Sequence, residues 1–389
     1  MNVLWITPVY PNSQQPHAGV FCRIQAQQLA INGIIPRVIV PIPYVPPLVK
    51  CVNHRYAMFN SLSRHSMDGE IKVSYIRYLT TPSENIFNFS HLTQRLSLSR
   101  LKLPRPDLIH AHFAYPVGAA ASGLAKKWEV PLILTLHGDD VTIHPHASEW
   151  HRRRFAKTIQ STDCTIAISE ALAQQTEQLS ERKPRVLSPG IDLSRFLDMP
   201  ERTTERKRLG IPINSFVILY IGSLLTQKGV RDLAEAFHRS KLYNACLIFI
   251  GDGPQKPQGQ RIVYFGKQPN DQVPFFLAAA DLLVLPSHHE GLGQVILEAG
   301  AARVPVIGAA TGGIVNLLSE NRGWLFPPKD VDSLARCLTF VQQNPIEAKN
   351  RTIRLYQHIL KNHVLSKNAE KLIDIYHETI RIHGTDKET

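Results

Sequence analysis

Short hydrophobic runs alternate with longer segments of helical spacing along the whole chain. In the first half, runs rich in β-branched and aliphatic residues recur at Val3–Thr7, Arg37–Ile42, Asp107–His112, Pro131–His137 and Thr165–Ser169. In the second half, similar runs recur at Phe216–Gly222, Cys246–Gly251, Arg261–Gly266, Asp281–Ser287 and Val304–Ala309. Continuous apolar strands that alternate with helices are typical of a parallel sheet covered on both faces. The pattern therefore predicts an α/β fold with two doubly wound sheets.

A polar and charged segment, Asp198–Ser215, separates the two sets of runs and has the composition of an interdomain linker with one short helix. We therefore expect a first domain over 1–200 and a second domain over 201–367. The last stretch, 368–389, is expected to form a helix and a tail. The residues of helical spacing within it are Leu372, Ile375, Tyr376 and Thr379. Because no predicted strand follows this helix, we expect it to pack back on the first domain.

The composition is that of a globular protein. The 389 residues suffice for two domains, and 43% hydrophobic with 20% charged residues excludes disorder and low-complexity fibres. No apolar run approaches the roughly 18 residues of a membrane span, and the first residues lack the features of a signal peptide. The five cysteines contain no C-x-x-C pair, so neither a disulfide framework nor a zinc ribbon is indicated. These features predict a cytoplasmic protein.

The net charge of +12 lies mainly in the first half of the chain, with +8 in residues 1–195 and +4 in residues 196–389. A basic surface attracts nucleic acid, an anionic membrane or a phosphorylated ligand, and the sign of the charge alone does not choose among them. The sequence has no Arg-rich recognition helix, zinc finger or aromatic RNA-binding motif. We therefore expect no nucleic-acid partner.

The segment that follows the run at Asp281–Ser287 carries two glutamates. Ligands of open parallel sheets bind beyond the carboxyl ends of the strands. Glu290 stands in a glycine-rich turn there, and Glu298 follows on a helix expected to begin near Gly293. The backbone N–H groups of the turn, formed by Gly291, Leu292 and Gly293, favour an anion. The alternative is that Glu290 caps the helix and Glu298 forms an exposed ion pair.

Two further glycine-containing loops follow strands of the second sheet. In Ile221–Val230, Gly222 and Gly229 frame a loop with Lys228 near its end, which makes this lysine a candidate phosphate contact or simply a solvated side chain. The sequence Gly251–Pro254 begins like a dinucleotide fingerprint. Pro254, together with Pro257, obstructs the helix that such a fingerprint must open, so NAD binding is disfavoured.

Histidines and aspartates follow strands of the first sheet. His110 and His112 face the same side of one strand, where they either ligate a metal or are packed and hydrogen-bonded. His137 precedes Gly138 at a strand end, a place suited to a catalytic or ligand-orienting group. Asp139 and Asp140 are adjacent, so their side chains should point apart rather than form a metal pair. Asp330 and Asp332 have D-x-D spacing but lie where a helix is expected to begin.

Taken together, these segments resemble glycosyltransferase family 4, the retaining nucleotide-sugar transferases of GT-B fold. The resemblance covers nearly the whole chain and rests on the order and spacing of several motifs. The motifs are HAGVF (17–21), LTLHGDDV (134–141), SPGIDLSRF (188–196), IGSLLTQKGV (221–230), GDGP (251–254) and EGLGQVILE (290–298), which matches an E-x7-E pattern. The implied fold is two Rossmann-like domains facing a central cleft.

The resemblance implies roles for residues of both domains. Glu298 matches the glutamate that binds the donor ribose, Glu290 the one near the transferred sugar, and Lys228 the lysine that holds the donor diphosphate. His137 falls beside the reacting centre, where both His137 and Glu290 are implied to be catalytic. The remaining implied donor contacts are Gly19, Gly222, Ser223, Gly291, Leu292 and Gly293. Acceptor or reacting-centre candidates are His112, Asp139 and Asp140.

Three residues depart from the family pattern. Ser223 stands where the family often has an arginine, so one positive charge on the diphosphate is missing or comes from elsewhere, Lys267 being a candidate. Arg303 occupies a place that is commonly glycine, and Asn316 stands where GG-x-x-E has its acid. The first departure bears on donor affinity and the other two on sugar selectivity.

The resemblance implies transfer of a sugar from a nucleotide-diphosphate sugar to a hydroxyl of a glycan or lipid-linked acceptor in surface polysaccharide or glycolipid assembly. Neither a metal nor another cofactor is expected, because Lys228 and helix dipoles would stabilise the diphosphate. One alternative is a non-catalytic GT-B scaffold that binds nucleotide sugar or glycan as a partner subunit. Another is an epimerase or hydrolase of related architecture, which fits the E-x7-E context less well.

Two segments of the first domain mix apolar and basic residues, namely Pro46–Phe59 and Ile86–Pro106. The basic residues of the second segment are Arg95, Arg100, Lys102 and Arg105. Basic amphipathic segments bind to anionic membrane surfaces, whereas ordinary packing against the sheet produces the same pattern. With the excess charge of this domain, the sequence predicts a peripheral protein on the inner face of the membrane.

Overall fold

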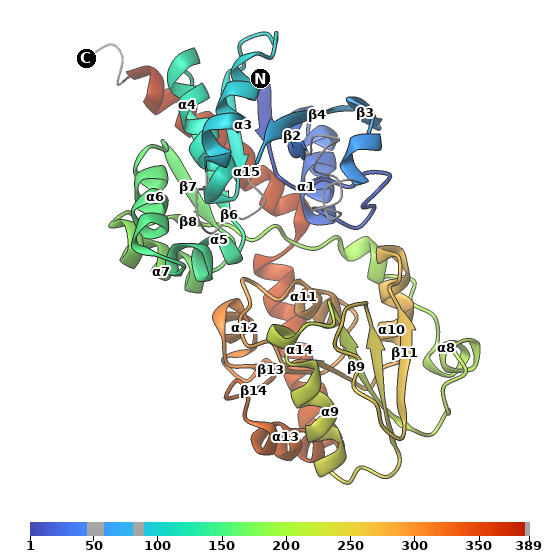
Figure 1. Cartoon of the computed structure of the whole chain (residues 1–389). Coiled ribbons are helices and arrows are strands. Elements are labelled where there is room, and N and C mark those ends of the chain that lie inside the picture. Colours follow the sequence, from blue (N-terminus) through green and yellow to red (C-terminus); the bar gives the residue numbers. More distant parts are fainter. Residues whose placement is uncertain (45–57, 81–88, 386–389) are drawn as a thin grey trace. The chain divides into compact units, whose positions relative to one another are not determined.

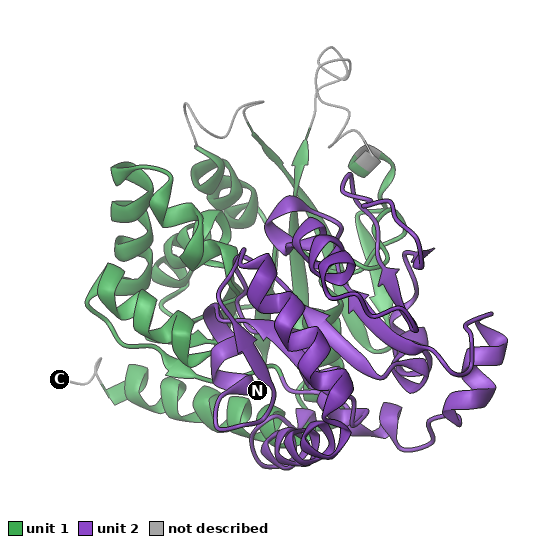
Figure 2. Cartoon of the chain, turned by 90° about the horizontal axis from the view of Figure 1, so that it is seen from below, with its two compact units in different colours: residues 1–189, 366–389 green, residues 190–365 purple. Residues whose placement is uncertain are grey.

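The computed structural model describes residues 1–44, 58–80 and 89–385. The chain forms two compact units, coloured separately in Figure 2: unit 1 comprises Met1–Pro189 and Ser366–Thr389, and unit 2 comprises Gly190–Leu365. Each unit is a parallel sheet with helices, as the alternation of apolar runs and helical segments predicts. The expected α/β fold with two doubly wound sheets is confirmed.

The sheet of unit 1 has the strand order β3-β4-β2-β1-β5-β6-β7-β8 among the described residues. All neighbouring strands are parallel except β3 and β4. The strands are β1 (Val3–Ile6), β2 (Arg37–Tyr44), β3 (His65–Asp68), β4 (Ile71–Leu79), β5 (Leu108–His112), β6 (Leu132–Leu136), β7 (Cys164–Ala167) and β8 (Arg185–Val186). The central strand β1 is fully buried because both of its neighbours and the covering helices exclude water from it.

The α-helices described in unit 1 lie between its strands along the chain, except the last, which ends the chain (Figure 1). They are α1 (Val20–Ile31), α3 (Ser90–Ser99), α4 (Ala119–Trp128), α5 (Asp139–Thr142), α6 (Glu149–Gln160), α7 (Glu170–Ser180) and α15 (Leu365–Thr385). A short π-helical turn, Ala114–Gly118, follows β5, and Phe113 just before it has a φ of +69°.

The last helix, α15, packs on unit 1, as expected. Its residues Leu372, Ile375 and Tyr376 lie in one hydrophobic cluster with Trp5 of β1 and with the inner side of α1. Trp5 Nε1 donates a hydrogen bond of 3.1 Å to the Tyr376 hydroxyl. The end of the chain therefore completes the core formed by its beginning.

The sheet of unit 2 has the order β11-β10-β9-β12-β13-β14 among the described residues, and all its neighbours are parallel. The strands are β9 (Phe216–Ile221), β10 (Ala245–Ile250), β11 (Ile262–Gly266), β12 (Leu282–Leu285), β13 (Val306–Ala309) and β14 (Trp324–Phe326). The helices are α8 (Arg202–Arg208), α9 (Val230–Arg239), α10 (Val273–Ala279), α11 (Gln294–Ala301), α12 (Gly312–Leu318), α13 (Val331–Gln343) and α14 (Pro345–Asn362). No helix connects β10 to β11 in the described chain, which agrees with the positions of Pro254 and Pro257.

The two units divide between Pro189 and Gly190, earlier than the boundary that composition suggests near Pro200. The charged segment with the short helix α8 belongs to unit 2 because its side chains are anchored there. Arg206 is buried, and its guanidinium pairs with Asp281 at 2.6 Å. Such pairing allows charged side chains to pack within unit 2. The segment therefore has the polar composition of a linker although it is part of the folded unit.

Candidate functional site

Each sheet reverses its strand order at one point, and the candidate residues gather at these two points. The reversal lies between β9 and β12 in unit 2, and between β1 and β5 in unit 1. Ligands of open α/β sheets bind outside the carboxyl ends of the strands at such points. Two candidate sites are therefore defined, one by the loops after β9 and β12 and the other by the loops after β1, β5 and β6.

In unit 2, glycines hold the loops against one another. Gly229 has a φ of +66°, and a Cβ at this position would lie 2.1 Å from the carbonyl oxygen of Pro286. Gly312 has a φ of +48°, and a Cβ there would lie 1.7 Å from the carbonyl oxygen of Glu290. Positions of this kind accept only glycine without rearrangement. The loop after β9 and the start of α12 therefore both pack on the loop that carries Glu290.

Lys228 and Glu290 meet at the reversal point of unit 2. Lys228 Nζ donates a hydrogen bond of 2.9 Å to Glu290 Oε2, and the hydroxyl of Ser287 donates one of 3.2 Å to the same oxygen. The Lys228 side chain is 29% exposed and that of Glu290 is 19% exposed, so the pair is accessible to a ligand. The structure thus brings together a cation and a carboxylate that are 62 residues apart in the sequence.

Glu298 lies on α11 and is buried, so the interpretation of this residue as an exposed ion pair is wrong. Arg195 Nη1 lies 3.4 Å from Glu298 Oε1. Burial raises the pKa of Glu298 to about 6, although the charge of Arg195 acts in the opposite direction. A second nitrogen of Arg195 donates to the carbonyl oxygen of Asn270, which fixes the guanidinium beside the carboxylate.

The helix α11 begins where the sequence predicts, after Gly293, whose φ is +84°. No side chain caps this helix, so the interpretation of Glu290 as its cap is also wrong. The Gln294 side chain donates to the carbonyl oxygen of Gly190 at 3.2 Å. On the other side, α11 packs closely on α14, because a Cβ at Gly300 would lie 2.3 Å from Ile359 Cδ1. Glu298 is therefore held on a rigid element.

The remaining residues expected to contact a donor line the same loops. Gly222 follows β9 with a φ of +157°, and Ser223 beside it is exposed. The carbonyl oxygen of Ser223 accepts a hydrogen bond of 2.8 Å from the Tyr220 hydroxyl. Leu292 is buried, whereas Lys267 is exposed on the loop after β11, two strands away from β9 in the sheet order.

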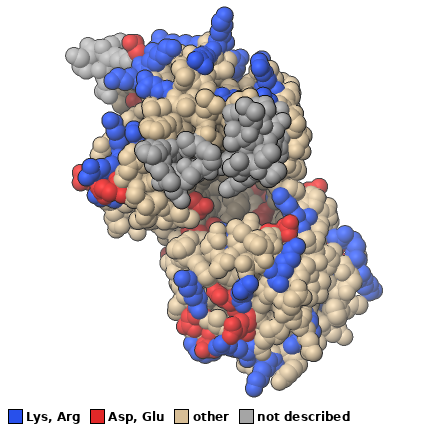
Figure 3. Space-filling view, viewed as in Figure 1, with Lys and Arg blue, Asp and Glu red and all other residues tan. Residues whose placement is uncertain are grey.

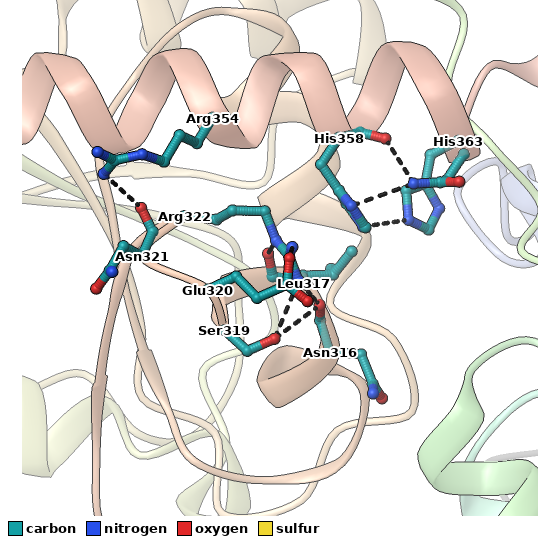
Figure 4. Close-up of polar contacts among 10 residues, drawn as sticks. Asn316, Leu317, Ser319, Glu320, Asn321, Arg322, Arg354, His358 and His363 are labelled. Carbon is teal, nitrogen blue, oxygen red and sulfur yellow. Dashed lines mark hydrogen bonds and ion pairs between the residues drawn. The ribbon is translucent and has the colours of Figure 1, made fainter.

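The departures at Arg303 and Asn316 lie in different surroundings. Arg303 stands between α11 and β13, at the amino end of the strand, and its guanidinium lies 4.5 Å from the centre of the Tyr356 ring. Asn316 lies on α12, whose last carbonyl groups are capped by Arg322 (Figure 4). Arg322 Nη2 donates to the backbone oxygen of Asn316 at 2.6 Å, and Nε donates to that of Leu317 at 2.8 Å. The side chain of Asn316 points away from this guanidinium.

In unit 1, Asp140 orders the loops after β5 and β6. Its Oδ1 accepts hydrogen bonds from the backbone N–H groups of His137 at 3.0 Å and Gly138 at 2.8 Å, and its Oδ2 accepts one from Ala114 at 3.1 Å. Asp140 is buried, and this burial raises its pKa. Asp139 is exposed, so the two adjacent aspartates do point apart.

His137 lies among aromatic rings and beside a second histidine. Its ring centre is 4.8 Å from that of Phe21 and 4.6 Å from that of Phe113. Its Nε2 lies 3.0 Å from His112 Nδ1, so the two imidazoles share a hydrogen bond. Burial lowers the pKa of His137 to about 3 and that of His112 well below its usual value. Both rings are therefore neutral at neutral pH.

His110 has the packed, hydrogen-bonded role that the sequence left open. Its Nδ1 lies 2.6 Å from the Tyr376 hydroxyl, and its Nε2 lies 2.7 Å from the Thr135 hydroxyl.

Gly19, at the start of α1, has a φ of +69°, and a Cβ there would lie 2.5 Å from the carbonyl oxygen of Val9. The glycine therefore allows the loop after β1 to lie against the start of α1.

Sequence reasoning did not assign a role to three residues of these two sites. Arg195 beside Glu298 stands inside the quoted SPGIDLSRF motif, and Ser287 beside Glu290 precedes the E-x7-E segment, so a signal was present for both. Cys22 lies on α1 near His112 and His137, and its sequence context gives no such signal. In the described residues, Cys164, Cys246 and Cys337 are free, as is Cys22, whereas Cys51 lies outside them.

Part of the Ile86–Pro106 segment, for which the sequence predicts membrane binding, forms α3. Phe89, Leu92 and Leu96 are 54%, 49% and 51% exposed. The basic residues Arg95, Arg100, Lys102 and Arg105 are also exposed. Lys and Arg side chains gather over the upper end of unit 1 in Figure 3, where Figure 1 shows α3 and α4. The expected contact at Pro46–Phe59 and the start of the Ile86–Pro106 segment fall largely outside the described residues.

None of the helices in the described parts of the chain combines the length and the apolar composition needed to cross a membrane.

Comparison with known proteins identifies two matching family models. Residues 19–195 match the model described as Glycosyltransferase Family 4, and residues 201–357 match the model described as Glycosyl transferases group 1. TuaC of Bacillus subtilis (strain 168), named as a teichuronic acid biosynthesis glycosyltransferase, is 36% identical over 381 residues, which cover 96% of this chain and 97% of TuaC. N-acetyl-alpha-D-glucosaminyl L-malate synthase of Bacillus anthracis is 27% identical over 71% of this chain and 75% of its own length.

Solved structures share the fold at low sequence identity. Sucrose-phosphate synthase from Thermosynechococcus elongatus has a TM-score of 0.81 at 17% identity, covering 98% of this chain and all of that one. Anabaena HepE in complex with UDP-glucose has a TM-score of 0.73 at 18% identity, covering 97% of this chain and all of that one. Both the family models and the long match to TuaC lead to one conclusion. The chain belongs to glycosyltransferase family 4, and it is a glycosyltransferase of GT-B fold.

Proposed function

We propose that this glycosyltransferase transfers a sugar, with retention of configuration, from a nucleotide-diphosphate sugar to a hydroxyl of a glycan or lipid-linked acceptor. The name of TuaC supports a role in surface polysaccharide or glycolipid biosynthesis. The UDP-glucose complex of Anabaena HepE, which shares the fold, supports a nucleotide-sugar donor.

The observation that carries the proposal is the contact between Lys228 and Glu290 at the strand reversal of unit 2, with Glu298 buried on α11, the helix that follows the Glu290 loop. In the proposed complex the Lys228 ammonium contacts the donor diphosphate, together with the N-terminus of α11 and the backbone of Gly291 and Gly293. Gly222 and Ser223 belong to the loop after β9, which also carries Lys228. Because Lys228 is already fixed by Glu290 at 2.9 Å, its charge is positioned before the donor binds.

Glu298 suits a vicinal diol such as the donor ribose. An ionised carboxylate accepts two hydroxyl hydrogen bonds at once. The buried position on α11 keeps water from competing for the carboxylate, and Arg195 compensates its charge. Glu290, one loop away, is proposed to contact the transferred sugar.

In the proposed reaction, the bond between the anomeric carbon and the leaving phosphate oxygen breaks as the acceptor oxygen forms a bond on the same face of the sugar. The acceptor proton passes to the leaving phosphate, so no protein base is required. Lys228 stabilises the negative charge that develops on the diphosphate. His137 is neutral because of its lowered pKa, and it contributes a hydrogen bond near the reacting centre rather than a positive charge.

The proposed reaction needs no divalent cation, because Lys228 and the α11 N-terminus supply the positive charge at the diphosphate. We therefore expect turnover to survive an excess of EDTA. Complete loss of turnover on chelation, restored by Mg²⁺ or Mn²⁺, would contradict this part of the proposal.

We further propose that unit 1 binds an anionic membrane surface from the cytoplasmic side. The exposed apolar side chains of α3 lie within the same segment as four exposed basic residues. Such a surface suits a lipid-linked acceptor, because it places the enzyme where that acceptor is found.

The proposed activity is tested by measuring nucleotide release from a panel of nucleotide-diphosphate sugars, with and without lipid-linked acceptors. We expect nucleotide release that depends on the acceptor, and a product whose anomeric configuration by NMR equals that of the donor. An inverted product would contradict the proposed stereochemistry. Absence of release with every donor would contradict the proposed donor class.

A further inference from the structure

Three potential metal ligands converge at the strand reversal of unit 1. Cys22 comes from α1, His112 from the end of β5, and His137 from the loop after β6. The Cys22 sulfur and one ring nitrogen of each histidine all lie within 4.8 Å of one another. Among the described residues, no other group of three or more His, Cys, Asp or Glu side chains brings its potential ligand atoms this close together. The residues are distant in sequence, so their convergence is a product of the fold.

A buried polar atom of this cluster has no protein partner. His112 is 0% exposed, and its Nε2 has no hydrogen-bond partner in the parts of the chain that the structure describes. A buried polar atom left in this way destabilises the folded protein, and a bound ligand would remove that cost. His110, two residues earlier on the same strand, provides the contrast because both of its ring nitrogens are bonded.

The Cys22 sulfur is held in place by a contact with Thr7. It lies 3.6 Å from the Thr7 hydroxyl, and that hydroxyl donates to the carbonyl oxygen of Val9 at 2.9 Å. The hydroxyl proton is thus directed to Val9, so in the metal-free protein the Cys22 thiol is the donor to Thr7. Trp5 packs on the other face of the site, with its ring centre 4.4 Å from that of His112. Neither contact involves His112 Nε2. His112 Nδ1 and His137 Nε2 are hydrogen-bonded to each other at 3.0 Å, and a cation held by both rings replaces that hydrogen bond.

We propose that Cys22, His112 and His137 form a binding site for a thiophilic divalent cation of the Zn²⁺ class. One thiolate and two neutral imidazoles are ligands that such a cation prefers, and a fourth position remains for water. Zn–N bonds of about 2.0–2.1 Å and a Zn–S bond of about 2.3 Å place tetrahedral ligand atoms about 3.3–3.7 Å apart. This separation is compatible with the three potential ligand atoms of the protein, which all lie within 4.8 Å of one another.

Binding changes the protonation of the site in a defined way. The metal–sulfur bond forms as the Cys22 thiol gives up its proton to the buffer, so one proton leaves the thiol for each cation bound. The cation would also occupy His137. If His137 acts as proposed above, the bound cation inhibits transfer; this consequence rests on the proposed function, whereas the binding itself does not.

The test uses Co²⁺ as a spectroscopic probe on the purified, metal-free full chain. We expect a cobalt–thiolate charge-transfer band, with visible d–d bands of tetrahedral Co²⁺, that saturates at one ion per chain and disappears when Zn²⁺ is added. The variant Cys22→Ser should lose the charge-transfer band. The matched control Cys164→Ser, which removes a thiol at the start of β7, should retain it. Circular dichroism checks that both variants are folded.

Absence of the charge-transfer band from the folded wild-type protein would overturn the proposal, as would an unchanged band in Cys22→Ser. If Cys22→Ser does not fold, His112→Gln serves as the second variant, and an unchanged cobalt spectrum in it would also overturn the proposal. Inhibition of transfer by Zn²⁺, and its absence in Cys22→Ser, is measured separately. Loss of activity in every preparation would thus bear on the proposed function, while the cobalt spectrum still reports on the site.

Discussion

At the scale of single residues, burial decides the ionisation of the candidate site. Glu298 has a pKa of about 6 because α11 removes it from water, and the neighbouring imidazoles of His112 and His137 are neutral for the same reason. The sequence indicated the importance of Glu298 through its spacing from Glu290. It could not indicate burial or the partner Arg195, because these depend on how a loop 103 residues away folds against α11.

The raised pKa of Glu298 predicts a pH dependence of donor binding. Its carboxyl group is ionised above about pH 6 and protonated below it, and only the ionised form accepts both hydroxyl hydrogen bonds. We therefore expect the KM for the donor to rise as the pH falls from 7 to 5, and Glu298→Gln to have a raised KM with a flatter profile. Steady-state kinetics over this range check the prediction. Equal pH profiles for wild type and Glu298→Gln would show that another group is responsible.

At the scale of helices and strands, the apolar runs predicted most of the central strands of both sheets, and the glycine-rich turn predicted the start of α11. The internal strand β4 was missed although most of its nine residues are buried, because Lys72, Ser74 and Arg77 interrupt its apolar residues. The other missed strands lie at the edges of the sheets and have weaker signals. The edge strand β3 is polar and mostly exposed, whereas β8 and β14 have two and three residues. Short edge strands are formed by pairing with a neighbour already in place rather than by their own composition. The close approach of the loops around Glu290 likewise became visible only in three dimensions.

The glycines of these loops provide a test at this scale. Gly229→Ala should lower transfer strongly, because the new methyl group would lie 2.1 Å from the carbonyl oxygen of Pro286 and displace the loop that carries Lys228. Gly210→Ala is the matched control. It has nearly the same φ, +67°, but nothing lies within 4 Å of the new methyl group. Both variants pay a similar backbone cost of about 1–2 kcal/mol. Equal kcat/KM values for the two would contradict the proposed loop contact.

At the scale of the whole molecule, the chain crosses between the two units twice, and its last helix returns to unit 1. The sequence predicted this return from an unpartnered amphipathic segment. It did not predict where the units divide, because paired charges such as Arg206 with Asp281 give a packed segment the composition of a linker.

The return of α15 predicts that Tyr376 stabilises unit 1. Tyr376→Phe leaves the buried Trp5 N–H and His110 Nδ1 without their shared hydroxyl partner. We expect the free energy of unfolding of unit 1 to fall by about 1–3 kcal/mol per unpaired group. Tyr243→Phe, at a side chain that is 79% exposed, is the control. Identical urea unfolding curves for the two variants would argue against this role of the helix.

Membrane binding is also a property of the whole surface. We expect co-sedimentation with vesicles to increase with their content of anionic lipid and to decrease at high salt. Replacing Arg95, Arg100, Lys102 and Arg105 by Gln should abolish this binding. Replacing the exposed Lys207, Lys241, Lys349 and Lys361 of unit 2 by Gln removes the same charge and should not. Binding that responds equally to both sets, or that does not distinguish neutral from anionic vesicles, would contradict the assignment to α3 and the residues that follow it, up to Arg105.

The central claim is that Lys228 supplies the positive charge for the departing diphosphate, and Lys228→Ala tests it most directly. Lys349→Ala removes an exposed lysine of the same unit and serves as the control. With the donor and acceptor identified by nucleotide release, we expect Lys228→Ala to lower kcat/KM about 10²-fold or more, as the loss of one preorganised charge contact does. The control should remain at the wild-type value. A Lys228→Ala enzyme as active as Lys349→Ala would contradict the account.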